Sequence, residues 1–178
     1  MIRKATSKDI DTIVAIYNKV LDLEERGKAS IGWQRGVYPT KDTALSALER
    51  NDLFVYEGKK GEVQATAIIN NNQMDSYAKG NWKVEATEEQ IMVLHTLVVD
   101  PDCSGRGIGR EFVAFYEQYA QEQGCKDLRM DTQVKNRAAR NLYHQLGYEE
   151  IGIVPCDFNG IHGISLVLLE KEIRTHKE

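Results

Sequence analysis

Residues 94–112, LHTLVVDPDCSGRGIGREF, constrain the fold of this chain more than any other segment. They begin inside the apolar, largely β-branched run Ile91–Val99, which predicts a buried central strand. Apolar residues from Phe112 onward recur at helical spacing and predict a helix that closes at Gly124. Between the two elements stand three alternating glycines, Gly105, Gly107 and Gly109. A buried strand, a glycine turn and a helix in this order indicate a protein that packs helices on a sheet.

The remaining periodicities extend this unit over the whole chain. Period-two or apolar runs predict strands, and three- and four-residue apolar spacings predict helices. The expected strands are Met1–Ala5, Leu53–Glu57, Val63–Asn70, Ile91–Val99, a strand through Leu128, Met130 and Thr132, Glu149–Val154 and Ile164–Lys171. The expected helices are one from Thr6 or Ser7 to near Gly27, Lys41–Arg50 with Leu45 and Leu48 packed inward, the helix after Gly109, and Asn136–Leu146. The order is β-α-α-β-β-β-α-β-α-β-β, an α/β or α+β arrangement. Residues 27–40 and 73–89 have no clean period and are expected to be loops.

Length and charge limit the classes of function that remain. We expect one domain over residues 1–178, since single domains commonly have about 100–200 residues. There are 27 acidic and 23 basic residues, a net charge of −4, without a Lys/Arg block. This charge does not fit a broad nucleic-acid or anionic-membrane surface. Because no apolar stretch approaches the roughly 20 residues of a membrane span and the first residues lack a secretory signal, a cytoplasmic location is expected.

The cysteines and histidines give no metal signature. Cys103, Cys125 and Cys156 are an odd number and form no Cys-x-x-Cys pair. They are expected to be free thiols, with Cys125 and Cys156 packed inside. His144, His162 and His176 also lack metal-ligand spacing. No metal is expected.

The glycine turn is suited to holding an anion. Glycine lets the backbone approach a ligand closely, and the first amides of a helix have no intrahelical acceptor. The positive end of the helix dipole, with Arg106 and Arg110, adds to the attraction for phosphate. A P-loop would require a Lys-Ser/Thr pair, which is missing, and a Rossmann fingerprint would require glycine where Arg110 stands. The nucleotide-binding alternatives therefore fit less well than another phosphate-bearing ligand.

Two motifs resemble the GNAT superfamily of acyl-CoA-dependent N-acyltransferases. Ser104-Gly105-Arg106-Gly107-Ile108-Gly109, after Val99-Asp100-Pro101, resembles its Gln/Arg-x-x-Gly-x-Gly/Ala signature. Asn136, followed by Ala139-Arg140-Asn141-Leu142-Tyr143-His144-Gln145-Leu146-Gly147-Tyr148, resembles its second signature. Ser104 stands where the family usually has Gln or Arg. The resemblance implies a mixed, mostly antiparallel sheet of about seven strands, flanked by about four helices and splayed at the central strands.

The resemblance also implies how acetyl-CoA would be bound. The amides around Gly105–Arg110 would hold the pyrophosphate. The predicted phosphate site comprises Ser104, Gly105, Arg106, Gly107, Ile108, Gly109 and Arg110, and the change at Ser104 affects one side-chain contact to the phosphates. The strand edge at Leu97, Val98 and Val99 would pair with the pantetheine arm as a further strand would. Asn136, Ala139 and Tyr143 would contact the arm from the other side.

Catalytic roles follow from the same resemblance. Tyr143 stands at the family position of the general acid that protonates the leaving thiolate. The glutamate found in many relatives is replaced by Val93, so the base is open. His95, on the same face of a regularly alternating strand, is the candidate because its ordinary pKa is near 6.5. A strand bulge would turn it away, and a histidine packed in the core is the alternative.

The predicted function is acetyl transfer from acetyl-CoA to a primary amine, carried by a small molecule or a peptide, by direct attack in a ternary complex. The alternative is a non-catalytic acyl-CoA-binding regulatory module. Substrate contacts are expected from the loops. The candidates are Trp33, Tyr38, Tyr77, Trp82, Glu85, Glu88 and the segment Pro155–Gly163 with Asp157, Phe158, Asn159 and His162. An exposed sheet edge would allow a homodimer.

Overall fold

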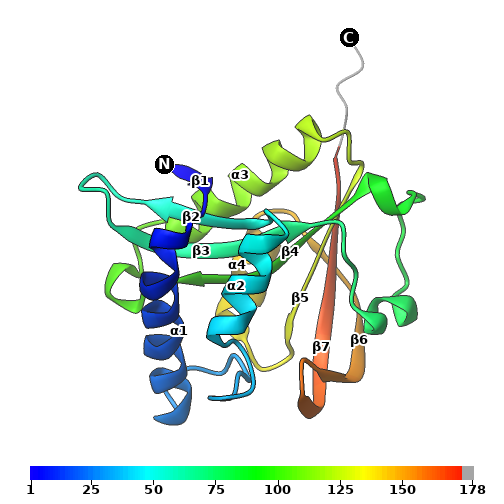
Figure 1. The fold of residues 1–178 in the computed structure, drawn as a ribbon. Helices are drawn as coiled ribbons and strands as arrows, with labels where there is room; N and C mark the ends of the chain where they lie inside the picture. The colour runs from blue at the N-terminus through cyan, green and yellow to red at the C-terminus, as the bar shows by residue number, and fades with distance from the viewer. Residues whose placement is uncertain (174–178) are drawn as a thin grey trace.

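The computed structural model describes residues 1–173, in which one seven-stranded sheet carries four α-helices (Figure 1). The strands are β1 (Ile2–Lys4), β2 (Leu53–Glu57), β3 (Val63–Asn70), β4 (Ile91–Val99), β5 (Asp127–Gln133), β6 (Glu149–Phe158) and β7 (Ile161–Glu172). The helices are α1 (Ile10–Glu25), α2 (Lys41–Glu49), α3 (Ile108–Glu122) and α4 (Arg137–Gln145). The element order predicted from the sequence is confirmed.

The strands follow the order β1-β2-β3-β4-β5-β7-β6, and β4 and β5 form the parallel pair in an otherwise antiparallel sheet. This confirms the mixed, mostly antiparallel sheet. The β4–β5 pairing extends from Ile91 opposite Asp127 to Leu94 opposite Met130 and then stops. Beyond this point β5 remains paired with β7, as far as Gln133 opposite Leu166. The central strands therefore separate, as expected.

The core has three parts, which show what covers each face of the sheet. Helices α3 and α4 bury one face around Phe112, Tyr116 and Tyr143. Helices α1 and α2 cover the β2–β4 half of the other face. Residues 71–90, here called the cover segment, lie over the β5–β7–β6 half, with Tyr77 against Val93 and Leu168. The segment without periodicity is thus a packed part of the fold, and it contains two short 3-10 turns.

Two local predictions differ from the structure. In α2 the fully buried residues are Ala44 and Ala47, while Leu45 is exposed and Leu48 only half-buried. The close approach of α2 to the sheet favours small side chains there. Strand β6 continues through Pro155 to Phe158, beyond its expected end. It is an edge strand, where proline need not donate to a ladder on its open side.

The cysteines are free thiols, with Cys125 buried as expected and Cys156 only half-buried. Among the described residues, no helix has both the length and the apolar character needed to cross a membrane. His176 lies outside the described residues.

Candidate active site

The glycine turn is a backbone cradle between β4 and α3. Gly105 and Gly107 adopt φ values of +75° and +81°, in the left-handed region that favours glycine. A Cβ atom added at either position would meet no protein atom within 4 Å, so the space above the turn is open. Glu111 donates the first helical amide bond, to the Gly107 carbonyl at 3.1 Å. The amides of residues 105–110 precede that bond and are free to bind an anion.

The cradle is fixed in place by its neighbours. Asp100 caps the short turn before it by accepting from the Asp102 amide at 3.0 Å. The Lys19 ammonium of α1 lies 2.8 Å from the Asp100 carboxylate and 2.7 Å from that of Asp102. Ser104, Arg106 and Arg110 are exposed at the rim. The guanidinium groups of Arg106 and Arg110 therefore add positive charge to the rim of the turn.

Strand β4 presents an open edge next to the cradle. The Asp100 amide donates to the Gln64 carbonyl of β3 at 2.7 Å, and Val98 lies opposite Thr66 of the same strand. Because hydrogen-bonding directions alternate along a strand, Leu97 and Val99 direct their backbone groups away from β3, toward the separation from β5. The predicted edge is thus available at Leu97 and Val99 to an extended ligand with amide groups. The predicted backbone contact of Val98 does not fit, because the Val98 backbone is directed toward β3.

A β-bulge determines where β4 turns. Two residues, Thr96 and Leu97, stand opposite the single Ala67 of β3, and Thr96 has a φ of +51°. A bulge adds a residue and bends the strand. The bend begins just beyond Leu94, where the pairing with β5 ends. The bulge and the separation of the strands therefore open the same part of the sheet.

A cavity of about 100 Å³ lies between the separated strands. On the side of α4 it is lined by Leu97, Asn136, Ala139 and Tyr143. On the opposite side it is lined by residues from the α1–α2 loop (residues 26–40) and the β6–β7 hairpin, among them Trp33, Tyr38 and Phe158. The structure thus brings four of the predicted cofactor-side residues and three of the predicted substrate-side aromatics to one cavity, while Val98, Val99 and residues 104–110 do not line it.

Tyr143 and Asn136 reach the cavity from α4. Tyr143 is buried, and burial together with the nearby Asp131 carboxylate raises the pKa of its phenol above the ordinary value. The phenol is therefore protonated at neutral pH and can donate. Asn136 is the N-cap of α4, with its Oδ1 accepting from the Ala139 amide at 3.2 Å.

Asp131 of β5 is the acidic residue of the cavity, and it is absent from the predicted site. Burial raises the pKa of its carboxyl from 3.8 to about 6, and the hydrogen bond from the Tyr77 hydroxyl, 2.7 Å long, opposes that rise. A carboxylate with a pKa near 6 is a suitable proton acceptor at neutral pH. The alternation of Asp127, Arg129 and Asp131 was visible in the sequence. It is typical of a solvent-facing strand side, whereas the cover segment buries it.

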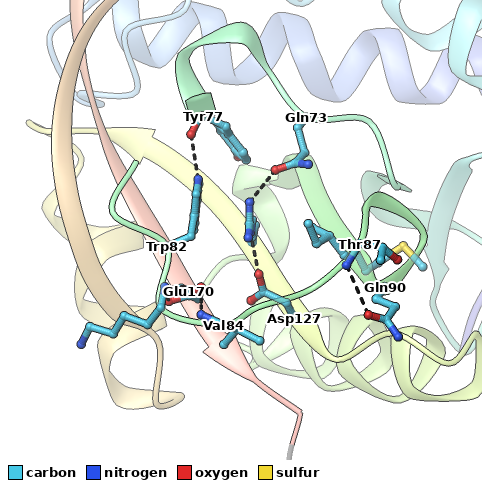
Figure 2. A network of polar contacts seen from close by, with 12 residues as sticks. Gln73, Tyr77, Trp82, Val84, Thr87, Gln90, Asp127 and Glu170 are labelled. Carbon is cyan, nitrogen blue, oxygen red and sulfur yellow. Dashed lines mark hydrogen bonds and ion pairs between the residues drawn. The ribbon is translucent and has the colours of Figure 1, made fainter. Parts of the chain in front are cut away.

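The charged row on β5 continues beneath the cover segment (Figure 2). The Arg129 guanidinium lies 2.6 Å from the Asp127 carboxylate, donates to Gln73 at 2.7 Å and stacks 4.0 Å from the Trp82 ring centre. Trp82 in turn donates to the Tyr77 carbonyl at 2.7 Å. Trp82 therefore holds the segment that places Tyr77 against Asp131, and it does not line the cavity.

The Glu170 carboxylate of β7 anchors the following part of the cover segment. It accepts the backbone amides of Lys83 and Val84 at 2.9–3.1 Å. Figure 2 shows Val84 next to Glu170. Glu85 and Glu88, offered as substrate contacts by the sequence, are exposed on this segment outside the cavity.

His95 occupies a different position from the one its predicted role requires. Its Nε2 lies 3.0 Å from both Asn70 Oδ1 and the Asn72 carbonyl, two acceptors, so Nε2 carries the proton. The Asn70 amide donates onward to Asp52 at 2.7 Å. Burial lowers the pKa of His95 to about 4. The bulge follows His95, and the residue does not line the cavity.

The remaining candidates are at the hairpin tip. Asp157 and His162 form an exposed contact of 3.0 Å, and Asn159 has a φ of +47° in the turn. These residues do not line the cavity, whereas Phe158 beside them does. Within residues 1–173, no three side chains of the His, Cys, Asp or Glu type gather as metal ligands would.

Comparisons with known proteins identify a family for this chain. The model of the acetyltransferase (GNAT) family matches residues 18–148. An uncharacterized N-acetyltransferase of Methanocaldococcus jannaschii is 26% identical over 159 residues, which are 86% of this chain and 62% of that protein. The chain thus spans less than two thirds of that relative's length.

Two further proteins of Salmonella typhimurium are similar to this chain. Its aminoalkylphosphonate N-acetyltransferase is 26% identical over 84% of each chain. A structure from the same species, solved with its cofactor acetyl-CoA, has a TM-score of 0.70 at 21% identity and covers 100% of this chain and 96% of its own. The latter likeness is one of fold.

Proposed function

The chain belongs to the GNAT acetyltransferase family, and from this premise we propose that it transfers an acetyl group from acetyl-CoA to a primary amine. The observation that carries the proposal is the end of the β4–β5 pairing at Leu94 and Met130, beside a cavity that holds Asp131 and Tyr143. One opening thus joins a backbone anion cradle, an open strand edge, a carboxylate and a phenol.

The residues around the opening fit acetyl-CoA. Gly105 and Gly107 leave space that a side chain would fill. The amides of residues 105–110, which precede the first helical bond, would donate to the pyrophosphate. The β4 edge at Leu97 and Val99 would bind the amide groups of the pantetheine arm. Asn136 and Ala139 would contact the arm from α4. When bound, acetyl-CoA supplies the activated acetyl thioester.

The chain's own residues would handle the protons of the reaction. We assign the role of general base to Asp131, which takes the proton that the amine loses as its nitrogen–carbon bond forms. Tyr143 is the general acid, and its phenolic proton goes to the sulfur as the carbon–sulfur bond breaks. Proton transfer from Asp131 to Tyr143 or to water then restores both groups. Charges and protons balance without a metal ion.

His95 is the second candidate for the base. Its unprotonated Nδ1 is a possible proton acceptor, but a pKa of about 4 makes it a weak one, and it lies outside the cavity lining. Asp131 has both the position and the more suitable pKa. The pH dependence of turnover separates the two candidates, because their pKa values differ by about two pH units.

Titration calorimetry with acetyl-CoA, CoA, ATP and NAD, followed by an amine-panel assay for released thiol, tests the proposal. We expect acetyl-CoA and CoA to bind in preference to ATP and NAD, with thiol release on at least one amine. CoA binding without turnover of any amine would instead favour a regulatory module that binds acyl-CoA. Absence of CoA binding would contradict the assignment of the glycine turn.

A further inference from the structure

The side of the cavity opposite α4 is closed by aromatic rings from two distant segments. Trp33 and Tyr38 come from the α1–α2 loop, and their ring centres are 6.0 Å apart in an edge-to-face arrangement. Phe158, from the β6–β7 hairpin, lies edge-to-face at 5.3 Å from Tyr38. The Tyr38 hydroxyl is hydrogen-bonded to Thr96 at the β4 bulge. The rings therefore form a continuous wall between loop, hairpin and sheet.

The α1–α2 loop is held in this closed position by helix α1. The Glu24 carboxylate accepts the amides of Ile31 and Gly32 at 2.7 and 3.0 Å. The Arg35 guanidinium contacts the carboxylates of Asp22 and Glu25 at 2.5 and 2.7 Å. These contacts lie before and after Trp33 in the chain, and they hold the aromatic wall in place.

The volume of the cavity limits the size of an acceptor. A closed apolar cavity of about 150 Å³ can hold benzene, whereas this one has about 100 Å³ and must also admit the acetyl group. Only a few non-hydrogen atoms of the acceptor fit next to the reacting centre. An extended peptide would require an open groove where the aromatic wall stands.

The charge of the residues that line the cavity also limits which acceptors fit. Asp131 supplies the one carboxylate of the lining residues, which include no lysine, arginine or histidine in the described part of the chain. The neighbouring guanidinium groups are paired elsewhere: Arg50 lies 2.9 Å from Asp52, and Arg129 lies 2.6 Å from Asp127. An anionic group on the acceptor would thus meet the half-buried Asp131 carboxylate and no cationic side chain among the described residues that line the cavity.

We infer that the acceptor is a compact, small-molecule amine that carries no acidic group next to its reacting end. This inference rests on the proposed acetyl transfer and narrows it to a substrate class. The ammonium form is attracted by the Asp131 carboxylate and by the faces of the aromatic rings. A carboxylate or phosphonate in the same place is repelled, and like charges brought together in an interface cost several kcal/mol.

Four amines with one skeleton test the inference. Propylamine, β-alaninamide, β-alanine and 2-aminoethylphosphonate share the N–C–C unit and end in a methyl, an amide, a carboxylate and a phosphonate group. For each we would measure kcat/KM with acetyl-CoA, and binding to the CoA-loaded protein by calorimetry. We expect kcat/KM for the two anionic amines to be lower than for β-alaninamide by about a hundredfold. A tripeptide that begins with alanine provides the peptide comparison.

Two comparisons of variants test whether the cavity causes the preference for amines without an acidic group. One compares Asp131→Asn with the wild type, and the other compares Trp33→Ala with Gln34→Ala. In the Asp131→Asn variant the ratio of the Kd for β-alanine to the Kd for β-alaninamide should fall by at least about tenfold, because the repelling charge has been removed. Trp33→Ala should weaken binding of β-alaninamide, while Gln34→Ala, at the exposed neighbouring position, should not.

The results separate the substrate class from the proposed acetyl transfer. Equal or faster acetylation of β-alanine, 2-aminoethylphosphonate or the tripeptide would overturn the substrate class while leaving acetyl transfer intact. CoA binding without turnover or binding of any of the amines would also overturn the class. Failure to bind CoA would contradict the proposed function itself.

Discussion

The Tyr77 hydroxyl donates a 2.7 Å hydrogen bond to the Asp131 carboxylate, and this bond connects the cover segment with the cavity. Tyr77 is almost fully buried, and its backbone carbonyl accepts the Trp82 side chain. A donor held in this way stabilises the ionised form of Asp131. The cover segment thus positions the group that we propose as the general base.

Replacing Tyr77 with phenylalanine should shift the pH profile. Loss of the donor raises the pKa of Asp131 above its value of about 6, because only the ionised carboxylate benefits from the bond. Asp131 accepts protons only when ionised, so the acidic limb of kcat/KM should move upward by about one pH unit. Activity lost near neutrality should return at higher pH.

Tyr17→Phe is the matched control for this shift. Tyr17 is a buried tyrosine whose hydroxyl has no hydrogen-bond partner among the described residues. Its loss should leave the acidic limb in place. A Tyr77→Phe profile that coincides with the wild-type profile would argue against Asp131 as the titrating group.

The position of the acidic limb also distinguishes the two candidate bases. With Asp131 as the base the limb lies near pH 6, and with His95 it lies near pH 4. We expect Asp131→Asn to lower kcat/KM by about a hundredfold or more and to remove the limb. His95→Gln, which retains a donor toward Asn70, should keep the limb near 6. The reverse pattern would transfer the role to His95.

Tyr143→Phe should slow acetyl transfer and spare acetyl-CoA binding. The variant keeps the ring that lines the cavity and removes only the proton donor. General-acid catalysis contributes about 10²–10⁴-fold, so kcat should fall by about a hundredfold or more while the Kd for acetyl-CoA changes little. Single-turnover kinetics and calorimetry measure the two quantities. Unchanged turnover would remove Tyr143 from the mechanism.

Gly107→Ala should impair the anion cradle beyond its effect on folding. Alanine at a φ of +81° costs about 1–2 kcal/mol, and the new methyl group enters the open space above the turn. We expect CoA affinity to fall about tenfold or more. Gly124→Ala, at a φ of +78° after the C-terminal end of α3, introduces the same strain at the opposite end of that helix from the cradle. It should reduce stability similarly and leave CoA affinity unchanged.

Asp131→Asn should also alter the dependence of stability on pH. Burial raises the pKa of Asp131 from 3.8 to about 6, so the folded state binds this proton more tightly than the unfolded state. Its stabilising effect is present below about pH 4 and is lost as pH rises through about 6. The free energy of unfolding of the variant, relative to wild type, should therefore increase by about 2 kcal/mol from pH 4 to 7. Urea titrations at several pH values measure this difference, and a constant difference would contradict the assigned pKa.

The parts of the site that depend on local chemistry could be predicted from the sequence. Gly105 and Gly107 identify a turn in the left-handed region before a helix, and Asn136 identifies the start of the next helix. Tyr143 follows from the motif on that helix, and the structure places it in the cavity. Within each of these motifs, the residues that determine the geometry are neighbours in the chain.

Asp131 and His95 could not be assigned in this way. On β5 the alternation of charged and apolar residues is the same whether the charged side faces water or a covering segment. Only the packing of residues 71–90 shows that Asp131 is half-buried and accepts a hydrogen bond from Tyr77. For His95, the regular alternation of β4 predicts a face but not the bulge at Thr96 or the hydrogen bonds to Asn70 and Asn72.

The sequence by itself determined the order of the elements, the glycine turn before α3 and the resemblance to the GNAT family, because periodicity and turn chemistry act over a few residues. Only the tertiary structure decided which side chains share the cavity. Trp33, Asp131 and Phe158 are remote along the chain, with Trp33 98 residues before Asp131 and 125 before Phe158. They line one cavity because β4 and β5 separate and two loops close over the opening. Distances of this kind come from packing between remote segments, which no local pattern contains.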